Sequence, residues 1–404
     1  MILSFLYDPF MWSAFFEKIC IKEGVFLNRS NFNWGPGLFL ITYHIILLVG
    51  IPLYLMQYTP SAALIITSAV LMYITGLSVT VGYHRLYSHT TYKTKPVVEA
   101  VLLFFGAMAT EGSALRWSFD HRYHHAFVDT DKDPYSIKKG FWYAHFMWLF
   151  EKPREIENKV VSDLVKNPLV SFQHRYYPTL MFATNILATA AIGWYFNDFL
   201  AAFLFGWMLR LFFLHHLTWF INSLAHTWGQ RTFCQELSAV DNYIIALLTF
   251  GEGYHNYHHT FAYDYRNGIK WFHFDPTKWI IWTLSKLGLA SKLKKNQRFF
   301  IEERILLNRK RILLDALQDS YEDQKEVLKE TITTLSDSAQ KKLRQMKELS
   351  ERYQSAKKSK NEKDLLIQLR SQLKEAKKEF QKDWDNWLDV SKDLMASHPV
   401  KSAH

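Results

Sequence analysis

Nine of the 17 histidines in this chain gather in three short boxes and one flanking position. The boxes read His-Arg-Leu-Tyr-Ser-His at 84–89, His-Arg-Tyr-His-His at 121–125 and His-Asn-Tyr-His-His at 255–259, with Asn-Ser-Leu-Ala-His at 222–226 before the third. A neutral imidazole offers a lone pair without adding a charge, which makes histidine the commonest metal ligand near neutral pH. So many imidazoles suit two transition-metal ions rather than one.

The spacing within each box fits a metal site. Residues three and four apart lie on one face of a helix, so the three imidazoles of 121–125 can converge, and so can those of 255–259. His84 and His89 are five residues apart and suit a helix end where the backbone bends. One His-x-x-His-His would be weak evidence, because lone histidines are more often core or surface residues. Two such boxes and a His-x4-His, each after an apolar stretch, indicate a metal site.

Four apolar segments predict the helices that position these boxes. They lie near residues 38–56, 62–81, 180–195 and 199–220. An apolar helix of about 20 residues crosses a hydrocarbon core of roughly 30 Å. A short turn joins the first segment to the second, and another joins the third to the fourth. We therefore expect an all-α protein with two transmembrane hairpins. The apolar stretches 97–108 and 243–250 are too short to span and should pack inside the cytoplasmic domain or against the membrane surface.

The distribution of Lys and Arg predicts the topology. The short turns carry almost none, whereas 84–175 and everything after Arg231 are rich in both. By the positive-inside rule, the histidine boxes, the N-terminus and the C-terminal tail lie in the cytoplasm. The net charge of +10 is thus interpreted as membrane orientation and not as nucleic-acid binding.

Three regions follow from composition. Residues 1–35 combine aromatic residues with Lys18 and Lys22 and are typical of an interfacial amphipathic segment. Residues 36–290 hold the boxes and the apolar segments. Residues 291–404 form a charged tail whose apolar residues recur at helical spacing, as in a helical hairpin or coiled coil. Such stripes usually pack helices together or pair two subunits, so the tail could form a homo-oligomer; docking of an electron donor or of lipid is the alternative.

The order of the boxes, together with Asp133-Pro134, Gly-Phe-Trp-Tyr-Ala-His at 140–145 and Gly-Glu-Gly-Tyr before His255, resembles one family. It is that of the membrane-bound fatty acid desaturases, in the acyl-CoA Δ9 (stearoyl-CoA) branch, and the resemblance covers about 36–290. It implies a non-haem diiron oxidoreductase that uses O₂ to remove two hydrogens from a fatty acyl chain.

The resemblance also implies the metal ligands. Asn222 would reach one metal through a water, and His145 receives no ligand role. Imidazole alone does not choose among zinc, copper, iron and nickel, and zinc can replace iron in purified protein. Cys20 and Cys234 lie in none of the boxes, against a thiolate-rich structural zinc site. The implied ligands are His84, His89, His121, His124, His125, His226, His255, His258 and His259.

Carboxylates near the boxes are expected to orient the imidazoles by accepting their second N–H. Asp120 and Glu252 are the best placed, because each lies beside or near a box. Glu111, Asp129 and Asp133 are further candidates. An ordinary salt bridge or helix cap is an equal alternative for any one of them.

The acyl chain is predicted to run along one ridge of the second apolar helix. Counting back in fours from His84 gives Thr80, Gly76 and Met72, which lead away from the metal into the membrane. Gly76 and Met72 would then set the chain length. Trp117 is a further candidate substrate contact.

Head-group recognition departs from the resemblance. Animal acyl-CoA desaturases carry an arginine before the Asp of the second box, and this chain has Phe119 there. Phosphate recognition favours Arg and Lys, and the candidates are Lys138, Lys139, Lys152 and Arg154. Acyl-CoA is the first expected substrate, and an acyl group on a membrane lipid is the second.

Electrons must come from a separate ferredoxin, rubredoxin or cytochrome b5, because His398-Pro399 is not followed by the Gly-Gly of a fused haem domain. Two other functions stay open. A diiron hydroxylase would use the same histidines but insert oxygen. A non-enzymatic membrane metal carrier or sensor would hold exchangeable metal and consume no O₂.

Overall fold

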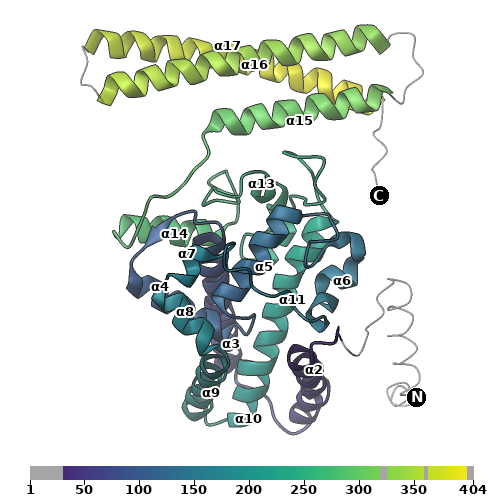
Figure 1. Cartoon of the computed structure of the whole chain (residues 1–404), viewed down its shortest axis with the longest axis vertical. Coiled ribbons are helices and arrows are strands. Elements are labelled where there is room, and N and C mark those ends of the chain that lie inside the picture. The colour runs from purple at the N-terminus through teal and green to yellow at the C-terminus, as the bar shows by residue number, and fades with distance from the viewer. Residues whose placement is uncertain (1–30, 319–324, 359–362, 398–404) are drawn as a thin grey trace. The chain divides into compact units, whose positions relative to one another are not determined.

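Helices make nearly all of the regular structure in this computed structural model, which describes residues 31–318, 325–358 and 363–397 (Figure 1). The predicted amphipathic segment lies almost entirely outside the described residues. The chain divides into two units. The first holds residues up to Gln230 and Leu237–Lys295, and the second holds Arg231–Glu236 and the tail from Asn296.

Among the described residues, four helices of the first unit are long and apolar enough to cross a membrane, which confirms the predicted all-α chain with four spans. The second and fourth are longer than predicted, because each continues to a histidine box. The second comprises α3 (Ala62–Ser78) and η3 (Val79–Ser88). The four spans are α2 (Trp34–Leu55), Ala62–Ser88, α9 (Tyr177–Phe196) and Phe199–His226.

The fourth span changes helix type along its length. It begins with α10 (Phe199–Ala201) and the π-helical η6 (Ala202–Leu209). It continues as α11 (Arg210–Ser223) and ends in η7 (Leu224–His226). One helix therefore runs from the apolar end of the unit to a predicted ligand.

Local residue chemistry makes the hairpin turns tight. Ser61 caps α3 by accepting a hydrogen bond from the backbone N–H of Leu64. Asn197 ends α9 in the left-handed conformation, with φ of 53°, which Asn tolerates better than most residues. Asp198 then caps α10, and the hydroxyl of Tyr54 donates to its carboxylate at 2.6 Å. These caps satisfy polar groups that lipid could not.

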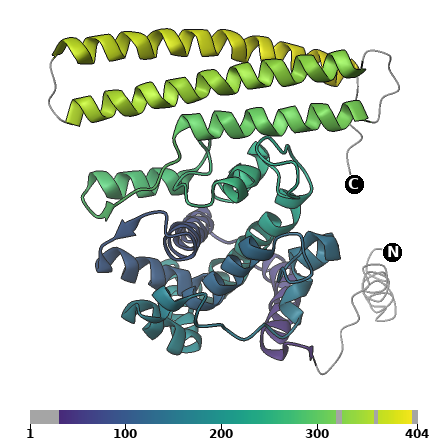
Figure 2. The same cartoon turned by 45° about the horizontal axis from the view of Figure 1, so that its top comes forward.

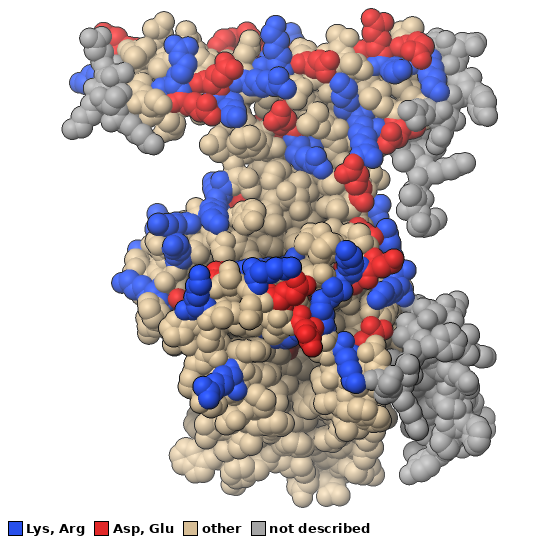
Figure 3. Space-filling view, viewed as in Figure 1, with Lys and Arg blue, Asp and Glu red and all other residues tan. Residues whose placement is uncertain are grey.

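Large apolar side chains cover the outside of the spans. Leu48, Ile66, Leu187 and Trp194 are more than half exposed. Figure 3 shows that the end of the unit formed by α2, α9 and α10 bears no Lys, Arg, Asp or Glu on the face drawn. Such a surface suits a hydrocarbon environment.

The end of the second span is a π-helix, and this explains the spacing of the first box. In η3 the backbone N–H of His89 donates to the carbonyl of His84 at 3.1 Å. The i to i+5 pattern places residues five apart on one face. His84 and His89 therefore point the same way, although an α-helix would separate them.

Shorter elements complete the first unit. Helix α5 (Ala114–Phe127) carries the second box and α13 (His255–Thr260) the third. The short apolar stretches form α4 (Pro96–Met108) and α12 (Tyr243–Leu248). Strand β1 (Lys93–Thr94) pairs antiparallel with β2 (Ala290–Ser291). The others are η4 (Ile137–Lys139), α6 (Phe141–His145), η5 (Met147–Phe150), α7 (Ser162–Val165), α8 (Pro168–Arg175) and α14 (Pro276–Lys286).

The described helices of the second unit lie side by side in a bundle (Figure 2). Its helices are α15 (Arg298–Gln318), α16 (Lys325–Lys358) and α17 (Lys363–Ser397). The apolar stripes of the tail meet in one core around Leu343, Phe380 and the fully buried Trp387. Val327, the first residue of the predicted stripe, is exposed.

Candidate metal centre and substrate cavity

The structure brings all nine predicted imidazoles together from four separate elements. Two groups of four have ligand nitrogens within 4.8 Å of one another. One group is His84, His89, His121 and His258, and the other is His124, His226, His255 and His259. The ninth, His125, places Nε2 at 2.9 Å from Nε2 of His258 and stacks on His259 with ring centres 4.2 Å apart. The arrangement matches two adjacent metal positions.

The donor set fits metal cations. Nε2 of His258 lies 3.0 Å from Nε2 of His84 and 2.9 Å from Nε2 of His125. A neutral imidazole carries one N–H, which cannot pair three nitrogens that face one another. Burial, helped by the neighbouring imidazoles, holds the pKa of His125 and His258 well below the usual value, so both rings keep a free lone pair. A cation between them would accept a lone pair from each.

Carboxylates hold two of the imidazoles from behind. Oδ1 of Asp133 lies 2.8 Å from Nδ1 of His124, and Oε2 of Glu252 lies 3.0 Å from Nδ1 of His84. All four side chains are buried. A carboxylate on Nδ1 fixes the tautomer that leaves Nε2 for a metal.

Glu252 is itself held in place. Arg85 donates to its Oε1 at 3.0 Å, and Asn267 donates to Oε2 at 2.6 Å. Burial alone would raise the pKa of Glu252, but the interactions with His84 and Arg85 lower it below the usual value. Asp275 holds Arg85 in turn, at 2.9 Å. Glu252 is thus an ionised group held in a fixed position beside His84.

A third imidazole is oriented by a serine hydroxyl that is held in turn by a carboxylate. Nδ1 of His226 lies 2.6 Å from Oγ of Ser238, and the Ser238 backbone N–H donates to Asp129 at 2.8 Å. The Ser238 hydroxyl donates to the other Asp129 oxygen at 2.5 Å. Asp129 adopts a positive φ of 62°, which is costly for a residue other than Gly. The sequence offered no signal for Ser238, which lies 109 positions from Asp129.

Asp120 has a different partner from the one that sequence predicted. Arg116 binds both of its oxygens from one turn earlier on α5. Burial raises the pKa of Asp120, and Arg116 opposes that shift. Among the described residues this carboxylate forms a salt bridge with Arg116 and does not hold an imidazole, because the i to i+4 spacing on a helix favours that pairing.

One cavity of the first unit, about 710 Å³ in volume, passes this histidine cluster. His84, His121 and His255 line it, and so does Asn222, the predicted water-mediated ligand. Trp117 lines it as well and stacks on His121 with ring centres 4.9 Å apart. A ligand in this cavity would lie directly against the imidazoles.

Basic side chains lie at the surface end of the cavity, together with the carboxylates of Asp131 and Glu151. Lys152 and Arg154 are exposed there, and Lys139 lines it with its ammonium group 3.1 Å from the Tyr143 hydroxyl. Arg116 supplies a guanidinium that sequence reasoning missed, one turn before Phe119. Lys138 is exposed and does not line the cavity. Three of the four predicted basic contacts therefore reach the cavity.

One of the buried carboxyl groups that line the cavity belongs to Glu111. Glu111 accepts a hydrogen bond from the Thr218 hydroxyl at 2.9 Å, and both residues line the cavity. Burial raises the pKa of Glu111 to about 7, although hydrogen bonds from Thr218 and Trp117 oppose the rise. The group therefore changes charge near neutral pH.

The predicted ridge of the second span reaches the cavity only at Thr80. A Cβ on Gly76 would lie 2.5 Å from the ring of Phe250, and it is Phe250 that lines the cavity. Met72 packs against the core around Val79 and Phe250. Counting in fours holds for an α-helix, but from Val79 onward the span is π-helical, so the ridge turns away.

Other histidines have hydrogen-bonding partners within the fold. Nε2 of His145 lies 3.0 Å from Nδ1 of His216, and Nδ1 of His145 lies 3.0 Å from the Ser223 hydroxyl. Nε2 of His44 lies 3.2 Å from Nε2 of His216. These contacts between histidines connect α2, α11 and α6, in agreement with a packing role.

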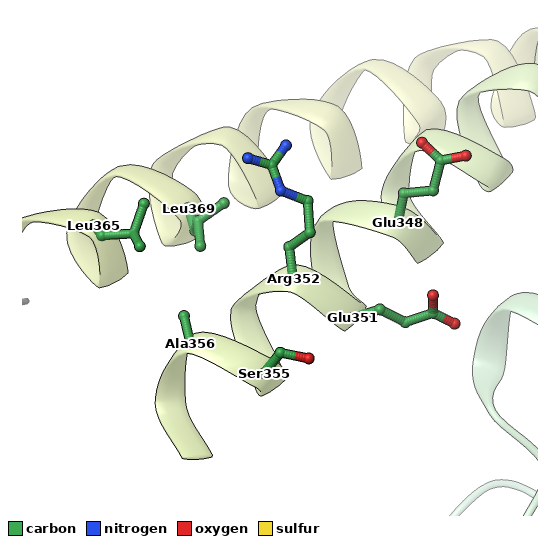
Figure 4. Close-up of a pocket in the computed structure, with 7 residues that line it drawn as sticks. All are labelled: Glu348, Glu351, Arg352, Ser355, Ala356, Leu365 and Leu369. Atoms are coloured by element: carbon green, nitrogen blue, oxygen red, sulfur yellow. The ribbon is translucent and has the colours of Figure 1, made fainter. Parts of the chain in front are cut away.

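A second hollow, of about 530 Å³, belongs to the other unit (Figure 4). Leu365 and Leu369 of α17 face Ala356 of α16 there, with Arg352 reaching between the helices. Neither imidazole nor thiol lines it. The candidate site is therefore the cavity at the histidines.

Comparison with known proteins agrees with this geometry. The sequence model of the family named fatty acid desaturase matches residues 60–290, which include every box and three of the four spans. The chain belongs to the fatty acid desaturase family. With its four apolar helices, this desaturase-family chain is an integral membrane protein.

Individual relatives confirm the resemblance to the acyl-CoA Δ9 branch. The chain is 42% identical over 277 residues to a probable acyl-CoA desaturase of Schizosaccharomyces pombe, covering 67% of this chain and 58% of the relative. It is 42% identical to acyl-CoA desaturase 1 of Saccharomyces cerevisiae, over 57% of this chain and 46% of the relative. It thus spans about half the length of these curated relatives. It is also 33% identical to an sn-1 stearoyl-lipid 9-desaturase of Anabaena variabilis, covering 66% of this chain and 95% of the relative.

Proposed function

We propose that this protein introduces a double bond, at the Δ9 position, into the acyl chain of a long-chain acyl-CoA. The observation that carries the proposal is one cavity with several Lys and Arg side chains at its opening, a buried inner part and an imidazole cluster between them. An acyl thioester has the same order of parts: a phosphorylated head, a reactive middle and an apolar end. The relatives named as acyl-CoA desaturases support this substrate.

Two irons held by the nine histidines, with Asn222 bound through a water, would activate O₂ and supply the oxidising power that no side chain has. The protein's own residues perform the remaining work. Glu252, Asp133 and the Ser238–Asp129 pair fix the imidazoles. Trp117 forms a flat wall beside His121, and the cavity keeps the reacting methylenes away from bulk water.

Charge at the opening would bind the head group. Lys139, Lys152 and Arg154 would meet phosphate oxygens, and a guanidinium group can do so with two parallel hydrogen bonds. The guanidinium of Arg154 is held over the Tyr123 ring, 4.4 Å from its centre, and donates to the Tyr123 hydroxyl at 2.7 Å. Arg116 also lines the cavity one turn before Phe119, but its guanidinium is held by Asp120.

An acyl group on a membrane lipid is the second candidate substrate. Gly35 and Pro36, in the first turn of the membrane helix α2, also line the cavity. A lipid could therefore reach the opening from the membrane side. The similarity to the stearoyl-lipid desaturase supports this alternative.

Orientation follows from the charge distribution. The turns after Leu55 and Phe196 carry no Lys or Arg, whereas the segments with the boxes carry many. The boxes, the N-terminus and the tail then face the cytoplasm. A soluble donor could deliver electrons there.

Expression in a yeast strain lacking its own Δ9 desaturase tests the function. The intact chain should produce monounsaturated acids, identified with their bond position by mass spectrometry. A variant with His258→Ala and His259→Ala should produce none, while Lys138→Ala, at an exposed site outside the cavity, should match the intact chain. Hydroxylated acids would instead identify a hydroxylase, and unchanged acids with iron-loaded protein would contradict the proposal.

A further inference from the structure

A lysine-rich surface lies beside the first histidine box. Strand β1 contributes Lys93, and Lys95 follows the strand directly. The segment after β2 contributes Lys292, Lys294 and Lys295. All five side chains are exposed. The pairing of Lys93 with Ser291 places the two segments side by side. These five residues are named the lysine ribbon.

The charge of the lysine ribbon is not neutralised by its own segments. Neither 89–98 nor 286–297 contains an Asp or Glu. The nearby carboxylates are engaged elsewhere: Glu99 accepts from the Tyr87 hydroxyl and from Asn167 at 2.7 Å, and Asp264 is paired with Arg266 at 2.8 Å. Exposed charges of one sign raise the local potential and attract partners of the opposite sign.

Lys294 connects this surface to a predicted metal ligand. Its ammonium group donates to the Thr90 hydroxyl at 3.1 Å, and its backbone N–H donates to the Thr91 carbonyl at 2.8 Å. Thr90 directly follows His89 and has a positive φ of 49°. The exposed Lys294 is therefore connected to His89 of the buried cluster by one hydrogen bond to Thr90 and one peptide bond.

Desaturation, on which this inference rests, needs an external electron source. One CH₂–CH₂ unit, one O₂, two protons and two electrons give one CH=CH unit and two waters. The acyl chain supplies two of the four electrons that O₂ takes up. The other two must reach the metal site from a carrier, and two cysteines in the whole chain cannot form a four-cysteine iron–sulfur site.

We propose that the lysine ribbon is the docking surface for a small acidic protein that carries one electron at a time. The charge fits such a partner, and the path through Thr90 leads to His89. Tyr263 is 66% exposed beside the ribbon, with the Lys294 ammonium group 5.0 Å from its ring centre. Tyrosine is enriched at protein interfaces, and small interfaces of this kind are typical of transient electron transfer.

Anionic lipid is the competing occupant, since Lys clusters near a membrane bind acidic head groups. A lipid surface would explain the charge but not the bonded path from Lys294 to His89. The protein carrier is therefore the proposal, and lipid binding is an outcome that the experiment can reveal.

The test uses the full chain and the soluble haem domain of cytochrome b5 as the probe. Lys292→Glu with Lys295→Glu reverses two charges of the lysine ribbon without removing the Lys294 contacts. Lys357→Glu with Lys374→Glu makes the same change at exposed sites of α16 and α17. Stopped-flow absorbance follows oxidation of the reduced haem domain by the ferric enzyme, and fluorescence anisotropy measures binding without any turnover.

We expect the ribbon variant to lower the association rate about tenfold at low salt and to flatten its salt dependence, because steering by opposite charges acts on this rate. Reduction by dithionite, which needs no docking surface, should be unchanged. The tail variant should stay within about twofold of the intact chain. An unchanged carrier rate in the ribbon variant, or a loss only in the tail variant, would overturn the proposal.

Two further readouts separate the alternatives. If the carrier rate is unchanged but the ribbon variant loses its response to phosphatidylserine in nanodiscs, the surface binds lipid and the proposal is overturned. If dithionite-reduced enzyme forms no unsaturated product, the proposed function fails. Carrier binding by anisotropy would then still decide whether the lysine ribbon is a docking surface.

Discussion

Oε2 of Glu252 lies 3.0 Å from Nδ1 of His84, and both side chains are almost completely buried. The contact joins the loop before α13 to the end of the second membrane span. The two residues are 168 positions apart in the sequence. Arg85 donates to Oε1 of Glu252, and Asn267 donates to Oε2. His84, one of the histidines that line the cavity, is therefore fixed by a network of long-range contacts.

Glu252→Gln should weaken metal binding by about 10- to 100-fold, as loss of a carboxylate behind a ligating imidazole generally does. Gln keeps the size but loses the charge that favours the metal-binding tautomer of His84. Titration of the metal-free protein with Co²⁺, followed by absorbance, measures the affinity. Glu157→Gln, at a surface pair with Lys159, is the matched control. Equal affinities for the two variants would show that Glu252 does not orient His84.

Ser238→Ala should lower metal occupancy at the group that contains His226 more than at the other group. The variant removes the hydroxyl between His226 and Asp129. Metal analysis after stepwise dialysis against a chelator measures the two losses, and one metal should leave well before the second. Ser238→Thr keeps the hydroxyl and should hold both metals as the intact chain does. Failure of Thr to restore it would assign Ser238 a packing role instead.

The sequence predicted what local geometry controls. His121 and His125 converge because four residues make about one turn of α5, and the spans are long apolar runs. The partners behind the imidazoles are not local. Ser238 reaches His226 through a loop, and Phe250 approaches Gly76 from a distant segment, so neither contact has a sequence period.

Helix type was the other property that spacing did not reveal. His84 and His89 share a face because η3 is π-helical, and the same change ends the predicted ridge at Thr80. Asp120 illustrates the opposite case. Its spacing from Arg116 was visible in the sequence, and the salt bridge was the simpler interpretation.

Acyl binding should weaken as pH rises through about 7, because burial raises the pKa of Glu111 to about 7. Below that pH the carboxyl is neutral in the cavity, and above it a desolvated charge faces the acyl chain. The free energy of unfolding should also fall between pH 4.5, the ordinary pKa, and about 7, since only the folded state keeps the proton there. Fluorescence titration with an acyl ligand and denaturant melts measure the two effects.

Glu111→Gln should remove the pH dependence of acyl binding. Asp241→Asn is the matched control, because burial likewise raises the pKa of Asp241 to about 7 but that residue does not line the cavity. The control should alter the pH dependence of stability and leave that of acyl binding unchanged. Persistent pH dependence in Glu111→Gln would place the responsible group elsewhere.

Lys152→Glu and Arg154→Glu should each raise KM for acyl-CoA about 10- to 100-fold, with little change in kcat. Each removes a charge-assisted contact of about 1.5–3 kcal/mol that is present equally in the ground and transition states. Steady-state kinetics with acyl-CoA measure the split. Lys138→Glu, an exposed change outside the cavity, should have a much smaller effect. If all three variants behave alike, the head group is not held by these residues, and the acyl-lipid alternative gains support.

Gly76→Leu should shorten the preferred acyl chain through Phe250. A side chain at Gly76 would displace the Phe250 ring, which lines the cavity, and the added volume should also lower the free energy of unfolding by about 1–3 kcal/mol. Product analysis with acyl chains of graded length measures specificity. Gly50→Ala, where a Cβ meets Leu204 at 2.9 Å on another span, controls for overpacking alone.

Phe250→Ala provides the reciprocal variant, and the pair forms a cycle. Alone it should extend the preferred chain, because it removes a ring from the cavity wall. In the Phe250→Ala background, Gly76→Leu should shorten the preferred chain much less than it does in the intact chain, since no ring remains for the new side chain to displace. Residues in direct contact are expected to be non-additive in this way. Additive shifts would show that Gly76 and Phe250 act independently, and an unchanged profile in both single variants would place the end of the acyl chain away from Phe250.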